Sequence, residues 1–341
     1  MTDKISSVRE ILNEKQLDFL MIENPIDVFY LTGMNFSRAR LVIGLKDAVL
    51  FLDGRYLDSA KDKFCCDKLS DKGLKEFVGD KNLGFDSVFT NVSEYQKYSS
   101  LGLGELTAIK NPLKSLRMIK DQGEIELLKK SASLNYKTFE YAKSLLQGKI
   151  TEKEVALEME IFFRKNGAEK IGFDPIVAFG KNSAYPHYFP TDNELTENDT
   201  ILFDMGCVVE NYYSDMTRMV FLPNAKEEMH GLFSHVKKAH DLAYALCKPG
   251  QNLGQLDGVV RDYFKEEKQE HLVKHSLGHG VGLEIHEAPS IRFDGEDRDI
   301  ILKPGMVFTI EPGLYQEGLG GVRYENTVMI THEGVENFYP V

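Results

Sequence analysis

Residues 201–218 read Ile-Leu-Phe-Asp-Met-Gly-Cys-Val-Val-Glu-Asn-Tyr-Tyr-Ser-Asp-Met-Thr-Arg. The apolar run at the start of this segment is typical of a buried strand, and it ends on Asp204. Asp215 follows within the same segment, after a short polar stretch. Burying a carboxylate beside an apolar run costs free energy unless the group is paired or binds a metal ion. The segment therefore indicates a strand scaffold that presents acidic side chains to a site.

Three further candidate ligands follow in the C-terminal half of the chain. His279 lies between two glycines, Glu311 follows the apolar run Phe-Thr-Ile, and Glu325 follows Val-Arg-Tyr. Four carboxylates and one imidazole suit Mn²⁺, Co²⁺ or Zn²⁺ rather than a soft thiolate site. With bridging carboxylates, five ligands fit a centre of two ions ~3.5–4 Å apart. Each acid alone is better explained by a strand end or a turn, whereas the five together favour a metal site.

The histidines of the same region add to this pattern. His275 and His279 are four positions apart, as in a helical zinc motif, but no glutamate follows His275 and the nearby glycines disfavour a helix. A lone histidine is more often a core residue. His286 makes three histidines within twelve positions of a glycine-rich segment, which favours a site. The run Gly-Leu-Gly-Gly at 318–321 is too short for a dinucleotide fingerprint and predicts a turn.

Composition limits the class of protein. The 341 residues are enough for two hydrophobic cores, because single cores stop growing at roughly 250–300 residues. The net charge of -12 argues against a nucleic-acid partner. No apolar run reaches the ~20 residues of a membrane helix, and the polar first residues do not resemble a signal peptide. We expect a cytoplasmic protein with free thiols at its four cysteines: Cys65, Cys66, Cys207 and Cys247.

Helix and strand signals divide the chain into two predicted domains. Residues 1–115 alternate helix and strand signals, which predicts a smaller α/β domain. It includes a helix opened by a capping box at Ser7 and a hairpin over 41–45 and 48–52. Residues 116–341 predict an α+β domain. Its expected helices begin at Asp121, Thr151 and Asn224, and its expected strands cover 200–204, 219–222, 306–310 and 322–330.

The candidate residues lie in motifs that resemble the pita-bread metallopeptidases: aminopeptidase P, prolidase and methionine aminopeptidase. The resemblance covers the whole second domain, including Pro-His-Tyr at 186–188, His-Ser-Leu-Gly-His-Gly at 275–280 and Thr-Ile-Glu-Pro-Gly at 309–313. The first domain, with Asn-Pro at 24–25 and Asp-Gly-Arg-Tyr at 53–56, resembles the N-terminal domain of the Xaa-Pro branch. The resemblance implies a pita-bread (creatinase/aminopeptidase) catalytic domain preceded by a creatinase-like α/β domain.

The resemblance also implies a role for each candidate residue. The five metal ligands would be Asp204, Asp215, His279, Glu311 and Glu325, with Asp215 and Glu325 bridging the ions. Glu311 would carry the proton from the attacking water to the leaving nitrogen, while His187 and His286 would steady the tetrahedral intermediate. His275 would line the proline pocket, and Arg323 would face the carboxylate end of the substrate. The alternative for Arg323 is an ion pair with a ligand carboxylate.

The implied activity is hydrolysis of the bond between an N-terminal residue and a following proline, by an Xaa-Pro aminopeptidase or an Xaa-Pro dipeptidase. The partners would be proline-containing peptides and a second copy of the chain in a homodimer. The cofactor would be two divalent ions, with Mn²⁺ expected first and Co²⁺ or Zn²⁺ as alternatives. A catalytically inactive peptide- or protein-binding module is the alternative function, although such relatives have lost ligands that are all present here.

Overall fold

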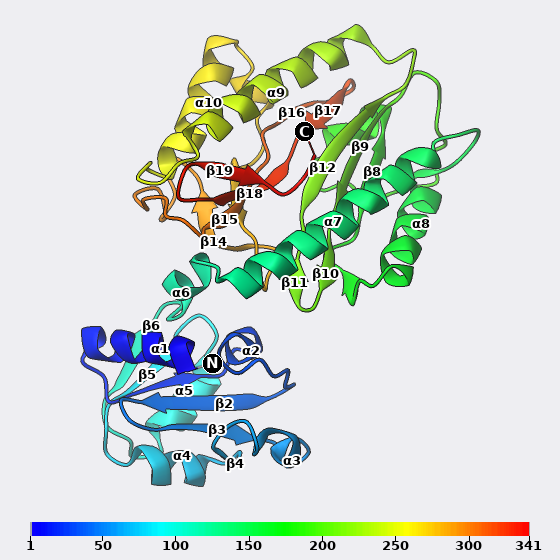
Figure 1. Ribbon diagram of the computed structural model, residues 1–341. Helices are drawn as coiled ribbons and strands as arrows, with labels where there is room; N and C mark the ends of the chain where they lie inside the picture. The colour runs from blue at the N-terminus through cyan, green and yellow to red at the C-terminus, as the bar shows by residue number, and fades with distance from the viewer. Residues whose placement is uncertain (1, 341) are drawn as a thin grey trace. The chain divides into compact units, whose positions relative to one another are not determined.

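The computed structural model describes residues 2–340 and separates into two compact units, Met1–Leu116 and Arg117–Val341. Each unit is described by itself, with the labels of Figure 1.

The first unit is built on one six-stranded mixed sheet in the order β4-β3-β2-β1-β5-β6. The predicted hairpin is confirmed, because β2 and β3 pair antiparallel with Ala39 opposite Leu52. The strands are β1 (Phe19–Ile22), β2 (Ala39–Gly44), β3 (Ala48–Leu52), β4 (Cys66–Lys68), β5 (Leu83–Asp86) and β6 (Leu106–Ile109). The helices are α1 (Thr2–Lys15), α2 (Pro25–Thr32), α3 (Leu57–Ala60), α4 (Asp71–Val78) and α5 (Val92–Ser99), with α6 (Lys114–Met118) at the junction.

The predicted start of the first helix is wrong. The helix α1 begins at Thr2, so Ser7 lies inside it rather than at its N-cap. The apolar period explains the difference: Ile5, Val8 and Leu12 are all buried, and Ile5 extends the buried face one turn before the Ser-x-x-Glu pattern.

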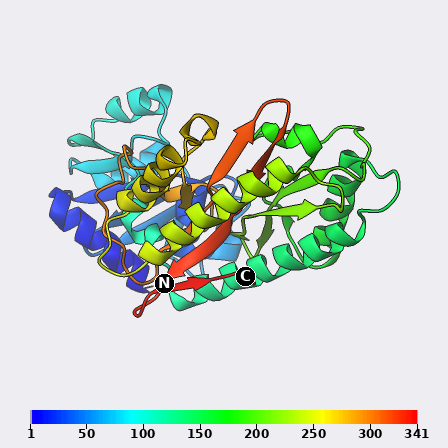
Figure 2. The ribbon, with the colours of Figure 1, turned by 90° about the horizontal axis from the view of Figure 1, so that it is seen from above.

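The second unit places its strands between two helix pairs (Figure 1). The helices α7 (Gln122–Ser144) and α8 (Glu152–Lys165) pack on β10 and β8, while α9 (Glu227–Leu246) and α10 (Gly254–Glu266) pack on β17 and β14. The strands are β7 (Lys170–Ile171), β8 (Ile176–Phe179), β9 (Thr200–Met205), β10 (Cys207–Val209), β11 (Tyr212–Tyr213), β12 (Met216–Phe221), β13 (Gly278–Gly280), β14 (Glu287–Ile291), β15 (Val307–Ile310), β16 (Gly313–Gln316), β17 (Gly320–Arg323), β18 (Asn326–Ile330) and β19 (Val335–Asn337). Two 3₁₀ turns, η1 (Gly180–Ala184) and η2 (Glu270–Leu272), complete the unit. Figure 2 shows the β16–β17 hairpin running beside α9.

Two of the three predicted helix starts are confirmed. Asp121 and Thr151 each cap a helix, and each forms a complete capping box with the glutamate three residues later. The predicted cap at Asn224 is wrong, because α9 begins at Glu227 after Lys226. The backbone N–H of Asn224 instead donates to the carbonyl of Glu197, and the chain turns once more before the helix starts.

The predicted strand over 322–330 is two strands. The strand β17 pairs with β16, whereas β18 pairs with β15 and β19 in a different sheet. The break between them falls on Tyr324 and Glu325, so Glu325 lies where the chain passes from one sheet to the next.

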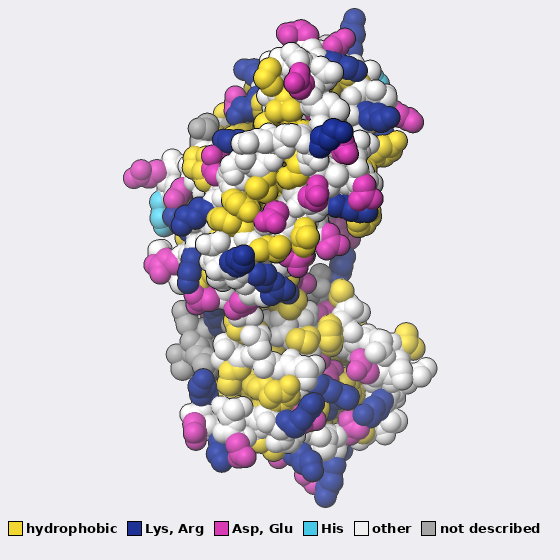
Figure 3. Space-filling model, turned by 90° about the vertical axis from the view of Figure 1, so that its right-hand side faces the viewer, with side chains coloured by type: hydrophobic (Ala, Val, Ile, Leu, Met, Phe, Trp, Pro, Cys, Tyr) yellow, Lys and Arg dark blue, Asp and Glu magenta, His cyan; other side chains and the backbone are white. Residues whose placement is uncertain are grey.

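The face of the molecule in Figure 3 carries lysine and arginine side chains interspersed with aspartate and glutamate side chains. Within residues 2–340, no helix combines the length and apolar character that crossing a bilayer requires.

Candidate metal centre

Strand ends bring the predicted ligands of the second unit together. Asp204 lies in β9 opposite Thr217 of β12, and Asp215 directly precedes β12. Ligand atoms of Asp215, His279 and Glu325 all lie within 4.8 Å of one another. The Nε2 atom of His279 is 3.5 Å from Asp215 Oδ2 and 3.5 Å from Glu311 Oε1. Residues far apart in sequence therefore share one buried cluster.

Two carboxylate oxygens in this cluster have no protein partner. Among the described residues, Asp204 Oδ1 and Glu325 Oε1 are buried and make no hydrogen bond. Buried polar atoms are almost always paired, so unpaired acceptors need a cation or water beside them. Oxygen and imidazole donors of this kind match the preferences of divalent ions of intermediate hardness. The residues present fit a metal centre.

The electrostatics of the cluster favour the same conclusion. Burial and repulsion by Glu325 raise the pKa of Asp215 and of Glu311 well above the ordinary range. Burial and the neighbouring Asp204 raise the pKa of Glu325 to about 8. Several carboxylates forced together in an apolar interior need positive charge to ionise at neutral pH.

His279 is held as a neutral imidazole, in an orientation that would suit a metal ligand. Its Nδ1 atom lies 3.1 Å from the carbonyl oxygen of Gly280, so Nδ1–H donates there and leaves the Nε2 lone pair facing the carboxylates. Burial and the neighbouring His286 lower the pKa of His279 to about 3. The flanking glycine at 278 is required by packing, because a Cβ there would lie 2.1 Å from the carbonyl oxygen of Thr309.

Arg323 adopts the ion-paired arrangement that was the alternative to a substrate contact. The side chain is 3% exposed, and its NH2 group pairs with Asp204 Oδ2. Its Nε donates to the hydroxyl of Thr217 at 2.9 Å, and its NH1 donates to the hydroxyl of Tyr315 at 2.6 Å. Thr217 in turn donates to Glu325 Oε2 at 2.7 Å. The guanidinium thus connects two of the candidate ligands.

Tyr315 also fixes His275. The Nδ1 atom of His275 lies 2.8 Å from the carbonyl oxygen of Ser276 and therefore carries the proton. The hydroxyl of Tyr315, 2.8 Å from Nε2, then donates to His275 while it accepts from Arg323. Burial, together with the nearby Arg323 charge, lowers the pKa of His275 to about 4. Both ring nitrogens of His275 are therefore used within the protein.

The other two predicted histidines lie at the exposed edge of the cluster. His286 is exposed and stands edge-on to His279, with 4.2 Å between the ring centroids. His187 is also exposed, in the connection between β8 and β9, and it lies close enough to Asp204, His275 and His286 to interact with them electrostatically. Both imidazoles are open to a molecule that approaches the cluster.

Sequence reasoning missed Thr217, Tyr315 and Tyr339 as parts of this site. Tyr339 donates to the backbone oxygen of Asp215 at 2.8 Å, and Thr327 donates to the same oxygen at 3.0 Å. Thr217 was within a recognised motif, but its role depends on a partner 108 residues away. No sequence motif marked Tyr315 or Tyr339 as part of the site, because a tyrosine in a strand or near a strand end is commonly a buried core residue.

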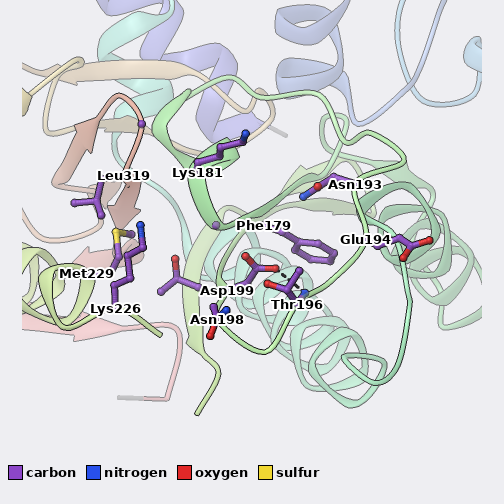
Figure 4. Close-up of a pocket in the computed structure, with 13 residues that line it drawn as sticks. Phe179, Lys181, Asn193, Glu194, Thr196, Asn198, Asp199, Lys226, Met229 and Leu319 are labelled. Atoms are coloured by element: carbon purple, nitrogen blue, oxygen red, sulfur yellow. Dashed lines mark hydrogen bonds between the residues drawn. The ribbon is translucent and has the colours of Figure 1, made fainter. Parts of the chain in front are cut away.

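A separate cavity of about 250 Å³ lies in the second unit (Figure 4). It is lined in part by Phe179, Thr200, Met229 and Leu319, and by none of the five candidate ligands. Phe179 and Thr200 are at the ends of β8 and β9 that lie away from Asp204, so this cavity is distinct from the metal cluster.

A buried cluster of four carboxylates and an imidazole, carried on strand ends between two helix pairs, defines a hydrolytic metalloenzyme of the pita-bread fold. The chain belongs to metallopeptidase family M24, whose model matches residues 126–332, and residues 4–119 match the creatinase/prolidase N-terminal domain.

Relatives in both comparisons extend over almost the whole chain. An Xaa-Pro dipeptidase of Pyrococcus furiosus is 32% identical over 98% of this chain and 97% of its own length. The structure of an Xaa-Pro dipeptidase from Bacillus anthracis superposes with a TM-score of 0.94 at 30% identity, over 99% of this chain and 98% of that one. An X-Pro aminopeptidase from Thermotoga maritima superposes with a TM-score of 0.87 at 32% identity, over 96% of each chain.

Proposed function

We propose that this metallopeptidase hydrolyses the bond between an N-terminal residue and a following proline, with two divalent ions bound by Asp204, Asp215, His279, Glu311 and Glu325. The observation that carries the proposal is the buried cluster with two unpaired carboxylate oxygens. When bound, such ions act as Lewis acids and lower the pKa of water from roughly 15.7 towards about 7.

The protein side chains supply proton transfer and charge stabilisation around this centre. Glu311 would take the proton of the attacking water and return it to the leaving proline nitrogen. His187 and His286, which are exposed beside the cluster, would donate hydrogen bonds to the developing oxyanion. His275 would border the proline ring. Arg323 would hold Asp204 and Tyr315 in place, and its contact with a substrate carboxylate stays a prediction.

The substrate class is supported by the names of relatives that align over nearly the whole chain, two of them Xaa-Pro dipeptidases and one an X-Pro aminopeptidase. Dipeptides are the first expectation, and longer peptides with proline second are the alternative. The decisive test compares release of alanine from Ala-Pro and from Ala-Pro-Ala by purified protein supplied with Mn²⁺ or Co²⁺. Cleavage of Ala-Pro alone identifies a dipeptidase, and cleavage of the tripeptide identifies an aminopeptidase.

A metal-free binding module is the competing function. It predicts an intact fold that holds peptides without cleaving them. Hydrolysis of neither substrate by protein with measured, bound metal would reject the enzyme proposal. Binding of intact peptides by protein that retains no metal would favour this module. The same metal analysis, carried out on protein as purified, would identify the ion that the site retains.

A further inference from the structure

Glu152 is a buried carboxylate outside the metal cluster. It is the first residue of α8 and is 0% exposed. Among the described residues, no lysine, arginine or histidine forms an ion pair with it, although a buried charge usually has such a partner. Its environment must therefore compensate the charge through neutral hydrogen-bond donors.

Six hydrogen bonds reach this carboxylate, and all come from one segment. Oε1 accepts from the backbone N–H of Phe179 at 2.8 Å and from the side-chain amides of Asn182 at 2.9 Å and Asn193 at 3.4 Å. Oε2 accepts from the hydroxyl of Tyr188 at 2.8 Å. It also accepts from the N–H and the hydroxyl of Thr191, at 3.0 and 2.8 Å. An ionised carboxylate, which only accepts, matches a ring of donors.

The donors run from Phe179, the last residue of β8, to Asn193, within the connection that leads to β9. Within residues 180–193 the only regular structure is the 3₁₀ turn η1. Figure 4 shows Phe179, at the end of β8, and Asn193, in the connection that follows it, beside the cavity. A segment with so little secondary structure would otherwise fluctuate readily. Hydrogen bonds to Glu152 fix this segment near its start, at Asn182, in its middle, at Tyr188, and at Thr191 and Asn193.

His187 lies inside the held segment. Asn182 precedes it and Tyr188 is its direct neighbour, and both donate to Glu152. Asn182 also donates to the hydroxyl of Tyr188 at 2.8 Å, which ties the two sides of His187 to each other. The ring of Tyr188 packs against Ile176, Ala178 and Leu202 of the β8–β9 sheet. Leu202 is in β9, so this packing connects the segment around His187 to the strand that carries Asp204.

We propose that Glu152 is a positioning residue that sets His187 for catalysis, an inference that rests on the proposed peptidase function. It does not touch substrate. It converts the flexible β8–β9 connection into a rigid support, so that the imidazole is already oriented when substrate arrives. Pre-orientation of this kind lowers the activation barrier, and a displacement of 1 Å costs up to about 100-fold in rate.

The test is a double-mutant cycle on the metal-loaded enzyme. Glu152→Gln replaces one acceptor oxygen by an amide that faces donors, while volume is kept. We expect kcat for Ala-Pro to fall about 10- to 100-fold with KM changed less than about threefold. In a His187→Ala background the same substitution should change kcat less than about twofold, because the residue it positions is gone.

The matched control is Glu154→Gln. Glu154 lies in the same first turn and serves the capping box with Thr151, a role that glutamine also fills. This variant should keep wild-type kcat. If Glu152→Gln does not fold, Tyr188→Phe takes its place in the double-mutant cycle. This variant removes one hydrogen-bond donor to Glu152 but keeps the packed ring, so we expect a smaller loss of kcat.

Hydrogen–deuterium exchange separates this inference from the proposed function. Exchange over residues 180–193 should rise in Glu152→Gln and remain unchanged in Glu154→Gln, whatever the substrate. An inactive wild-type enzyme would reject the peptidase proposal but leave the exchange result interpretable. A folded Glu152→Gln protein with normal kcat, or an equal loss in the His187→Ala background, would overturn the positioning role.

Discussion

At the scale of single residues, the guanidinium of Arg323 holds together groups that would otherwise move independently. The planar guanidinium contacts Asp204, Thr217 and Tyr315 at once. Thr217 then donates to Glu325, and Tyr315 to His275. Lysine cannot reproduce this geometry, since its ammonium is a single charge on a flexible stem.

Arg323→Lys should therefore lower metal affinity and turnover while the fold persists. Loss of supporting contacts around metal ligands typically costs about 10- to 100-fold in affinity or activity. Metal content by mass spectrometry after dialysis against a weak chelator, together with kcat/KM on Ala-Pro, checks this. Arg292→Lys provides the control, because Arg292 is exposed and forms its ion pair with Asp294, two residues further along the chain. Equal metal retention in both variants would contradict the supporting role.

Asp215→Asn tests the cluster more directly. Removal of one carboxylate charge should reduce bound metal and turnover in parallel, because the remaining ligands hold the ions less tightly. Asp262→Asn, on the exposed face of α10, should change neither quantity. Normal activity in Asp215→Asn would mean that this residue is not a ligand.

At the scale of elements, the glycine-rich strand β13 shows how packing constrains the site. A side chain at Gly278 would collide with the backbone of Thr309 in the segment that leads to Glu311. Gly278→Ala should therefore push β13 away from β15, displace His279 and lower both stability and metal content.

Gly258 supplies a matched comparison inside α10, where an added Cβ meets nothing within 4 Å. Gly258→Ala should stabilise the protein by about 0.5–1 kcal/mol, because alanine loses less backbone entropy in a helix. Thermal unfolding of the two variants measures the contrast. A stable, metal-replete Gly278→Ala protein would show that the strand can shift at little cost.

Sequence patterns correctly predicted helix starts and strands where the interactions of neighbouring residues determine the structure. Capping boxes gave the starts of α7 and α8, and the alternating apolar runs gave the β2–β3 hairpin. They failed where tertiary contacts decide. The strand over 322–330 looked continuous, because its break at Glu325 reflects a change of sheet partner that apolar periodicity does not record.

The same division holds for the site. The proposed ligands were identified from their residue types and motifs, whereas the supporting residues were not. Tyr315, Tyr339 and Glu152 act through partners that only the folded chain brings near, and neither residue type nor local spacing marks them.

At the scale of the whole molecule, the crowded carboxylates couple metal, pH and stability. In the metal-free folded protein, the pKa values of Asp215, Glu311 and Glu325 are raised. In the unfolded chain such carboxyl groups have a pKa of about 4. At a pH above about 4 the folded state therefore keeps protons that the unfolded state has lost. The folded state then binds more protons than the unfolded state, so stability falls as pH rises from about 4 towards 8. Metal binding reverses this trend, since it requires the deprotonated ligands.

We therefore expect Mn²⁺ to raise the melting temperature more at pH 8 than at pH 5.5, measured against EDTA-treated protein. Differential scanning calorimetry at both pH values, at fixed free-metal concentration, provides the comparison. The Asp262→Asn protein should behave as wild type. An equal or larger metal effect at pH 5.5 would show that the cluster does not take up protons on losing its ions.

The bond from Tyr339 to the backbone of Asp215 has a consequence for the order of events during synthesis. The two residues are 124 positions apart, so a ribosome makes the first long before the second. Asp204, Asp215 and His279 can emerge and collapse while Glu311, Glu325 and the tyrosine that braces Asp215 are still unmade. A nascent chain at that stage holds only part of the proposed ligand set, and we expect it to bind an ion weakly. We therefore expect the proposed centre to take up its ions only after Tyr339 has been made, from the free metal that the finished protein meets.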